Sequence, residues 1–195
     1  MKKNIFMMSK VPIKGNFKKR LSKQVGFIKS KRLICNNIEK IHKLFLRRKA
    51  YSMRYYLIPY KKFRSYSFCF YTKCILQSKG SLGDKMWHLI KSQQKPLIII
   101  GSDIPKINLK AISYSFKILR KYDVVIGPTY DGGFWLIGHS NKKKYVNPFK
   151  SIRWSTTNTL SDLIINLKKM KLTYQFTHKL RDIDNKVDYC ENNKD

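Results

Sequence analysis

Ten residues, Pro-Leu-Ile-Ile-Ile-Gly-Ser-Asp-Ile-Pro at 96–105, constrain the fold more than any other part of this sequence. A short run of Leu and Ile that ends in Gly-Ser-Asp is typical of a buried parallel strand, because such strands are covered on both faces. In open α/β sheets, ligands bind beyond the carboxyl ends of the strands. The segment therefore predicts that Asp103 lies at a ligand-binding edge of a sheet, unless it only caps the helix that follows.

The rest of the chain alternates expected strands and helices. Helices are expected where apolar residues recur at helical spacing, over residues 27–48, 82–92, 108–121 and 155–169. Asn108 is the expected cap of the third of these helices, and Ser155 or Thr156 that of the fourth. Strands are expected at 4–9, 53–59, 97–101, 123–127, 133–138 and 172–177, with a further candidate at 65–72. This alternation predicts one α/β domain, residues 1–195, with three layers: a mostly parallel sheet and helices on both of its faces.

The net charge of +31 is concentrated in the first half of the chain, where residues 1–83 hold 22 Lys or Arg and a single acid. A basic half can bind nucleic acid, an anionic membrane or phosphorylated substrates. Lys outnumbers Arg 33 to 9, however, and no nucleic-acid-binding motif accompanies the charge. Compositional bias together with a phosphate-binding cleft is therefore favoured over a nucleic-acid partner.

The beginning of the chain and its apolar segments bear on localisation. No apolar run reaches the roughly 20 residues that cross a bilayer. The first residues, Met-Lys-Lys-Asn-Ile-Phe-Met-Met, have a basic tip but too short an apolar segment for a signal peptide. We therefore expect a cytoplasmic protein without a membrane span.

The 11 acidic residues are few enough to search one by one for metal ligands. Five of them lie beside expected strand ends or glycine-rich turns: Asp84, Asp103, Asp131, Asp182 and Asp184. A magnesium or manganese ion on a diphosphate needs only one or two protein carboxylates. Two of these acids, contributed by distant loops, would therefore suffice.

Three loops carry the remaining candidate chemistry. Residues 10–21 hold Lys10, Lys18 and Arg20, which could surround a polyphosphate, although a basic loop is the default in a chain so rich in lysine. Asp131 begins an Asp-Gly-Gly element that favours a hairpin turn, and such a turn would hold its carboxylate rigidly. In the segment 181–184, an extended backbone would point both acids the same way, so that one could bind metal while the other pairs with the arginine.

Six motifs follow one another along the chain. They are Lys-x-Pro-x-x-Gly-x-x-Lys-x-Arg-Leu at 10–21, Gln with Gly-x-Leu-Gly-x-x-Met at 77–86, Gly-Ser-Asp-x-Pro at 101–105, Gly-Pro-x-x-Asp-Gly-Gly at 127–133, Trp-Ser-Thr at 154–156 and Arg-Asp-Ile-Asp at 181–184. In this order they resemble the bacterial GT-A-like glycosyltransferases associated with arsenosugar biosynthesis, within the nucleotide-diphospho-sugar transferase superfamily. The resemblance is weakest between Gly26 and Lys73, and the chain departs from the family pattern at Lys19, Ser81 and residues 185–188.

The resemblance implies a GT-A or Rossmann-like fold and transfer of a glycosyl group from a nucleotide-sugar donor to a small-molecule acceptor. It implies a divalent metal, Mg²⁺ or Mn²⁺, held by Asp103 and Asp184. Asp131 would be the catalytic residue, which orients an acceptor hydroxyl or acts as a general base. The residues implied in binding the nucleotide and its phosphates are Lys10, Gly15, Lys18, Arg20 and Gly83.

Two alternatives stay open. Nucleotidyl transfer, as in the molybdenum-cofactor and phospholactate guanylyltransferases of the same superfamily, uses the same metal and a similar basic loop. A non-catalytic binder of nucleic acid or an anionic surface would instead show binding that falls steeply with salt and does not require Asp103. None of these functions predicts an oligomeric state.

Overall fold

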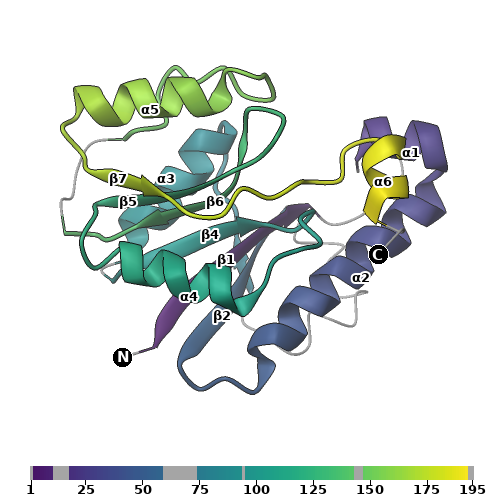
Figure 1. Cartoon of the computed structure of the whole chain (residues 1–195), viewed down its shortest axis with the longest axis horizontal. Coiled ribbons are helices and arrows are strands. Elements are labelled where there is room, and N and C mark those ends of the chain that lie inside the picture. Colours follow the sequence, from purple (N-terminus) through teal and green to yellow (C-terminus); the bar gives the residue numbers. More distant parts are fainter. Residues whose placement is uncertain (1, 11–17, 59–73, 94, 143–146, 193–195) are drawn as a thin grey trace.

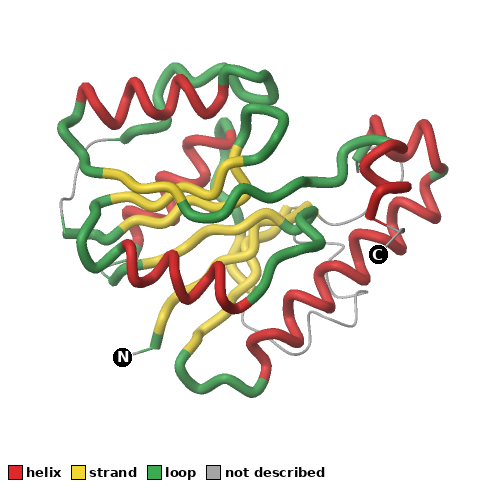
Figure 2. The backbone as a smooth tube through the Cα atoms, in the orientation of Figure 1, coloured by secondary structure: helices red, strands yellow, loops and turns green. Residues whose placement is uncertain are grey.

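A seven-stranded sheet forms the centre of the molecule (Figures 1 and 2). The structure is a computed structural model that describes residues 2–10, 18–58, 74–93, 95–142 and 147–192. The strands are β1 (Lys3–Lys10), β2 (Tyr51–Ile58), β3 (Cys74–Leu76), β4 (Leu97–Gly101), β5 (Val124–Pro128), β6 (Phe134–His139) and β7 (Tyr174–Phe176). Their order is β3-β2-β1-β4-β6-β5-β7, and β6 runs antiparallel to both of its neighbours. The other pairings are parallel, so the expected mostly parallel sheet is confirmed.

Helices cover both faces of the sheet, as the sequence predicts. The described helices are α1 (Lys19–Val25), α2 (Phe27–Leu46), α3 (Leu82–Ser92), α4 (Leu109–Ile118), α5 (Thr159–Lys169) and α6 (Lys186–Asn192). Helices α2 and α4 share one buried cluster with Ile98 of β4, whereas α3 and α5 share the other with Ile99. Adjacent residues of a strand point to opposite faces, so the apolar run of β4 contributes to both core layers. No helix in the described part of the chain has the length and apolar character needed to cross a membrane.

Most element boundaries agree with the sequence prediction, and two of the helix caps form as side-chain hydrogen bonds. Helix α3 spans 82–92 as predicted and begins with a capping box, in which Ser81 and Asp84 each accept the other's backbone N–H. Asn108 caps α4 by accepting the N–H of Ala111 at 2.9 Å. The Ser at position 81, a departure from the family pattern, is therefore a good helix cap here.

The predicted start of α5 is wrong. The helix begins at Thr159, and neither Ser155 nor Thr156 caps it. The Thr156 hydroxyl donates to the carbonyl oxygen of Arg153 at 2.8 Å and accepts the N–H of Asn158 at 3.2 Å, which stabilises a separate turn before the helix. Short α1 and α6 were also not predicted from periodicity, since seven residues are too few to show a helical repeat. The strand candidate at 65–72 and Gly15 lie outside the described residues.

The carboxyl ends of β4 and β5 meet the segment between β7 and α6. This segment runs along the sheet edge in an extended conformation (Figure 1, yellow). Leu180 pairs with Thr129 in a parallel bridge, and the Leu180 N–H donates to the carbonyl oxygen of Pro128 at 3.1 Å. Further along, the Ile183 N–H donates to the carbonyl oxygen of Asp103 at 3.1 Å. Residues distant in sequence are thus brought to one edge.

Candidate functional site

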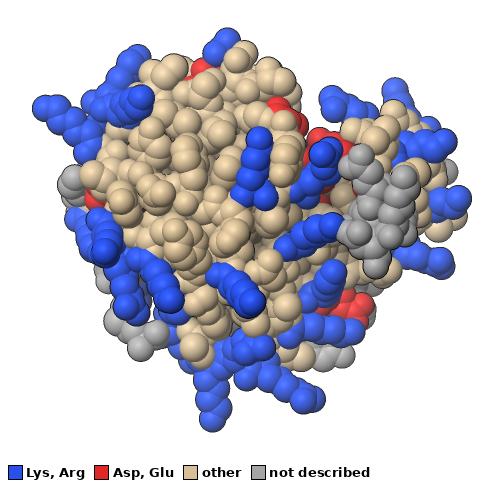
Figure 3. All heavy atoms as spheres, in the orientation of Figure 1, with Lys and Arg blue, Asp and Glu red and all other residues tan. Residues whose placement is uncertain are grey.

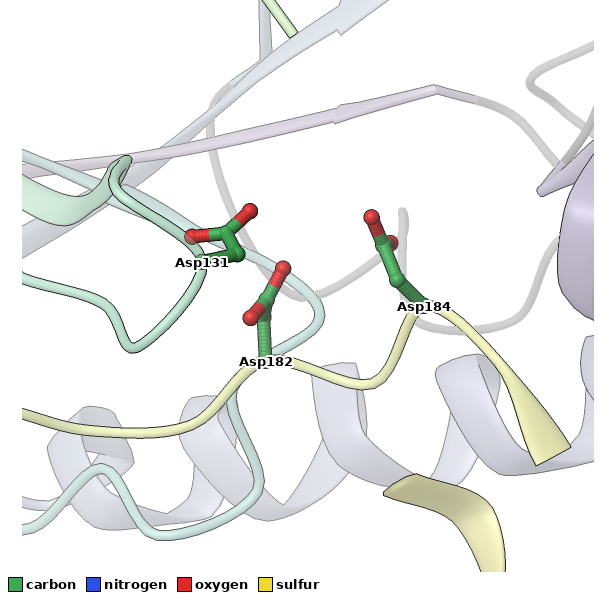
Figure 4. A group of neighbouring side chains, drawn as sticks. All are labelled: Asp131, Asp182 and Asp184. Carbon is green, nitrogen blue, oxygen red and sulfur yellow. The ribbon is translucent and has the colours of Figure 1, made fainter. Parts of the chain in front are cut away.

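Three carboxylates converge where the segment 180–184 crosses the ends of β5 and β4. Oxygens of Asp131, Asp182 and Asp184 lie within 4.8 Å of one another. Figure 4 shows Asp182 and Asp184 leaving their chain segment on the same side and reaching toward Asp131. Ile183 between them is buried, with 2% of its surface exposed, which fixes the alternation. The expected common direction of the two acids is therefore confirmed.

Asp131 is held rigidly by its own turn. Its Oδ1 accepts the hydroxyl of Thr129 at 2.5 Å and the N–H of Gly133 at 3.0 Å. Gly132 adopts φ +86°, and a side chain there would fall 2.2 Å from the carbonyl oxygen of Thr157. The Asp-Gly-Gly element thus forms the predicted turn between antiparallel β5 and β6 and fixes the direction of the carboxylate.

Lys18 joins the two residues expected to bind metal. Its Nζ donates to Asp103 Oδ2 at 2.6 Å and to Asp184 Oδ1. Burial by itself would lower the pKa of Lys18, but the two carboxylates raise it well above its ordinary value. The backbone of Lys18 is left-handed, with φ 39° and ψ 55°, which is uncommon for a residue with a side chain. One ammonium therefore bridges two carboxylates from distant parts of the chain.

The surroundings of Asp182 disfavour the ionised form of its carboxyl group. Burial, and then the negative charges of Asp131, Asp103 and Asp184, raise its pKa from 3.8 to about 6. Four of the chain's 11 acids thus act on one another at a single place, in a protein whose net charge is +31. Figure 3 shows acidic atoms in the hollow between the sheet and the α1–α6 part of the molecule, with Lys and Arg beside them.

These residues fit a hard divalent cation. Mg²⁺ and Mn²⁺ prefer oxygen ligands, and one or two carboxylates suffice when a substrate's phosphates complete the coordination shell. The mutual repulsion that raises the pKa of Asp182 would be relieved by a bound cation. Asp131, Asp182 and Asp184 lie close enough together to hold it, whereas Asp103 is joined to Asp184 through the ammonium of Lys18.

A buried polar network positions Asp103. The Ser102 hydroxyl donates to Ser9 Oγ at 2.9 Å, which joins the ends of β4 and β1. The side-chain amide of Asn37 donates to the carbonyl oxygen of Ser102 at 2.7 Å, which joins α2 to the same point. Neither Ser9 nor Asn37 was predicted as a site residue. The signal for Asn37 is a polar residue within the buried stripe of α2.

The remaining predicted site residues lie in different surroundings. Lys10 ends β1 and Arg20 lies in the first turn of α1, and both side chains are exposed. Gly83 is buried in α3, where an added Cβ would fall 2.6 Å from Cβ of Phe149. Close packing of α3 is therefore a sufficient reason for the glycine at position 83. Arg181 makes an ion pair with Asp188, 3.6 Å away, and its guanidinium lies over the ring of Tyr130.

The fold is that of nucleotide-diphospho-sugar transferases and nucleotidyltransferases. A protein from Desulfovibrio desulfuricans G20, provisionally classed as a nucleotide-diphospho-sugar transferase, superposes with a TM-score of 0.84 at 24% identity, over 95% of this chain and 84% of that one. CMP:2-keto-3-deoxy-manno-octonic acid synthetase in complex with CTP gives a TM-score of 0.60 at 11% identity, over the full length of both chains. Rv0371c of Mycobacterium tuberculosis H37Rv in complex with manganese gives 0.52 at 8% identity, over 98% and 97% of the two chains.

Comparison by sequence adds a family match. The family model "Uncharacterized protein conserved in bacteria (DUF2064)" matches residues 60–156, just under half of the chain. The matched region contains Asp103 and Asp131, whereas Lys18, Asp182 and Asp184 lie outside it. No curated protein matches the chain. The solved structures thus show a shared fold, and the family model adds a likeness in sequence over residues 60–156.

Proposed function

We propose that this protein transfers a glycosyl group from a nucleotide-sugar donor to a small-molecule acceptor, with the help of a divalent metal ion. The observation that carries the proposal is the convergence of Asp103, Asp131, Asp182 and Asp184 at the carboxyl ends of the strands. Acids are scarce in this chain, and four of them together would be costly without a cationic ligand. The motifs shared with glycosyltransferases associated with arsenosugar biosynthesis support the same conclusion.

The residues present have roles in such a transfer. A divalent cation bound by Asp103 and Asp184 would neutralise the diphosphate that leaves. The ammonium of Lys18, with Lys10 and Arg20 nearby in sequence, would supply further positive charge to the same group. Fixed cations are most useful here because the diphosphate gains negative charge as its bond breaks.

Asp131 is the proposed acceptor-side residue. In the transfer, the bond between the anomeric carbon and the diphosphate oxygen breaks, and its electron pair leaves with the nucleoside diphosphate. The acceptor oxygen forms the new bond to the anomeric carbon, and its proton passes to Asp131. Oδ1 of Asp131 already accepts hydrogen bonds from Thr129 and Gly133, so the acceptor's proton would pass to Oδ2.

Nucleotidyl transfer is the second candidate. The fold is shared with a synthetase solved in complex with CTP, and attack at an α-phosphorus would use the same metal and basic residues. The two reactions release different products. Glycosyl transfer from a nucleoside-diphosphate sugar releases a nucleoside diphosphate, whereas nucleotidyl transfer from a nucleoside triphosphate releases pyrophosphate.

The test is a panel of nucleotide sugars and nucleoside triphosphates with Mn²⁺ and candidate acceptors, assayed for both products. We expect release of a nucleoside diphosphate, and a fall in turnover of about 100-fold or more in Asp103→Asn and in Asp131→Asn. Asp162→Asn, which makes the same change of charge outside the site, should keep its turnover. Full turnover in both site variants would show that the site is misplaced. Pyrophosphate release would favour the second candidate, and salt-sensitive polyanion binding that is unchanged in Asp103→Asn would favour a non-catalytic binder.

A further inference from the structure

We propose that the ammonium of Lys18 occupies the place of the metal ion until a polyphosphate ligand arrives, so that metal and polyphosphate bind cooperatively. The inference rests on the proposed function, because it takes Asp103 and Asp184 as the metal ligands. It adds an internal competitor to that site. The competitor is part of the chain, and its release is easier when another anion accepts its ammonium.

Lys18 bonds both of the carboxylates that are proposed to hold the metal ion. Its Nζ donates to Asp103 Oδ2 at 2.6 Å and also to Asp184 Oδ1, residues 85 and 166 positions away in sequence. The side chain of Lys18 is 18% exposed, and those of Asp103 and Asp184 are 27% and 40% exposed. A cation that uses both carboxylates must therefore displace a largely buried ammonium from both of them.

The charge of the cluster carries the second step. Asp131 and Asp182 lie close to Asp184, so two further carboxylates adjoin the pair that bonds the ammonium of Lys18. The cluster is left with an excess of negative charge, which a divalent cation would neutralise better than Lys18 does. The exchange has a free-energy cost, because the ammonium of Lys18 must leave its two partners and bond new ones.

A polyphosphate provides those new partners. Its oxygens can accept the hydrogen bonds of the displaced ammonium and also coordinate the cation that replaces it. The left-handed backbone of Lys18, at the residue that precedes α1, holds its side chain toward this point at a conformational cost. Binding of either ligand thus prepares the site for the other, and the coupling must be reciprocal.

The test is a titration with Mn²⁺, followed by electron paramagnetic resonance, of the wild type, Lys18→Met and Lys19→Met. Lys19 is exposed and adjacent, so its variant makes the same change of charge without touching the bridge. We expect Lys18→Met to bind Mn²⁺ alone about tenfold more tightly than the wild type, and Lys19→Met to bind it as the wild type does. Equal affinity in the wild type and Lys18→Met would overturn the inference.

A second measurement needs no variant. The thermal stabilisation of the wild type is recorded with Mn²⁺ alone, with inorganic pyrophosphate alone, and with both. We expect the shift with both to exceed the sum of the separate shifts, and additive shifts would overturn the inference even if Lys18→Met fails to fold. Mn²⁺ binding without cooperativity would leave the proposed function standing. No Mn²⁺ binding under any of these conditions would overturn both.

Discussion

Replacing Asp182 by Asn should stabilise the metal-free protein. Burial and three neighbouring carboxylates raise the pKa of Asp182 from 3.8 to about 6, so its ionised form is disfavoured in the folded state. The shift corresponds to at most about 3 kcal/mol, because one pKa unit is worth about 1.4 kcal/mol. The side chain is partly exposed, and screening by solvent reduces this figure to about 1 kcal/mol. For a chain of this length, that is a rise in Tm of about 2–4 °C.

The sign of the pH dependence follows from proton binding. Between pH 3.8 and about 6 the folded state binds more protons at Asp182 than the unfolded state does, so this group lowers stability as the pH rises through that range. The advantage of Asp182→Asn should therefore be complete above about pH 6 and disappear below about pH 4. Chemical denaturation in a chelating buffer at pH 4.0 and 7.5 measures both limits.

Asp162→Asn is the matched control, because it makes the same substitution with the opposite expected result. Hydrogen bonds from Arg153 lower the pKa of Asp162 to about 2, so its ionised form stabilises the fold above pH 3.8 and this contribution is lost as the pH falls through about 2. This variant should be less stable than the wild type at pH 7.5. The reasoning for Asp182 would be refuted if Asp182→Asn were no more stable than the wild type at pH 7.5. It would also be refuted if the variant gained the same stability at pH 4.0 as at pH 7.5.

Two further predictions concern stability. Gly132→Ala should cost about 2 kcal/mol or more in denaturant unfolding, because an alanine Cβ would fall 2.2 Å from the carbonyl oxygen of Thr157 at φ +86°. Gly26→Ala, at φ +89° with open space around it, should cost less, and equal costs would contradict the steric explanation. Burial lowers the pKa of His139 below 6.5, so the unfolded state takes up the proton first and stability falls as the pH drops below about 6.5. Between pH 7 and 5, His139→Gln should therefore lose stability less steeply than the wild type, and an equally steep loss would contradict this reasoning.

The layers of the fold were predictable because they depend on short local patterns. The apolar run of β4 is continuous, and the apolar residues of α2 and α3 recur at helical spacing along each helix. The structure has all three elements where these patterns predict them. The start of α5 was not predictable in this way. A threonine such as Thr156 can cap a helix or stabilise a turn. Here its hydrogen bonds to Arg153 and Asn158 place it in a turn, and these bonds cannot be read from the local pattern.

The candidate site was predictable as a set of chemical groups but not as a set of contacts. The acids at 103, 131 and 184 stood out because acids are scarce and these follow strand ends. The bridge from Lys18 could not be foreseen, since a lysine in a basic loop carries no sign of which carboxylate it meets 85 or 166 residues away. Asp182 likewise gains its raised pKa only because the fold places three other carboxylates around it.

The most direct test of the central claim is the position of manganese in crystals grown with Mn²⁺ and a nucleoside diphosphate, located by its anomalous scattering. We expect a peak beside the carboxylates of Asp103 and Asp184, with the ammonium of Lys18 moved from between them toward the diphosphate. A nucleotide bound elsewhere, or manganese bound away from both carboxylates while Lys18 keeps its bridge, would contradict the account.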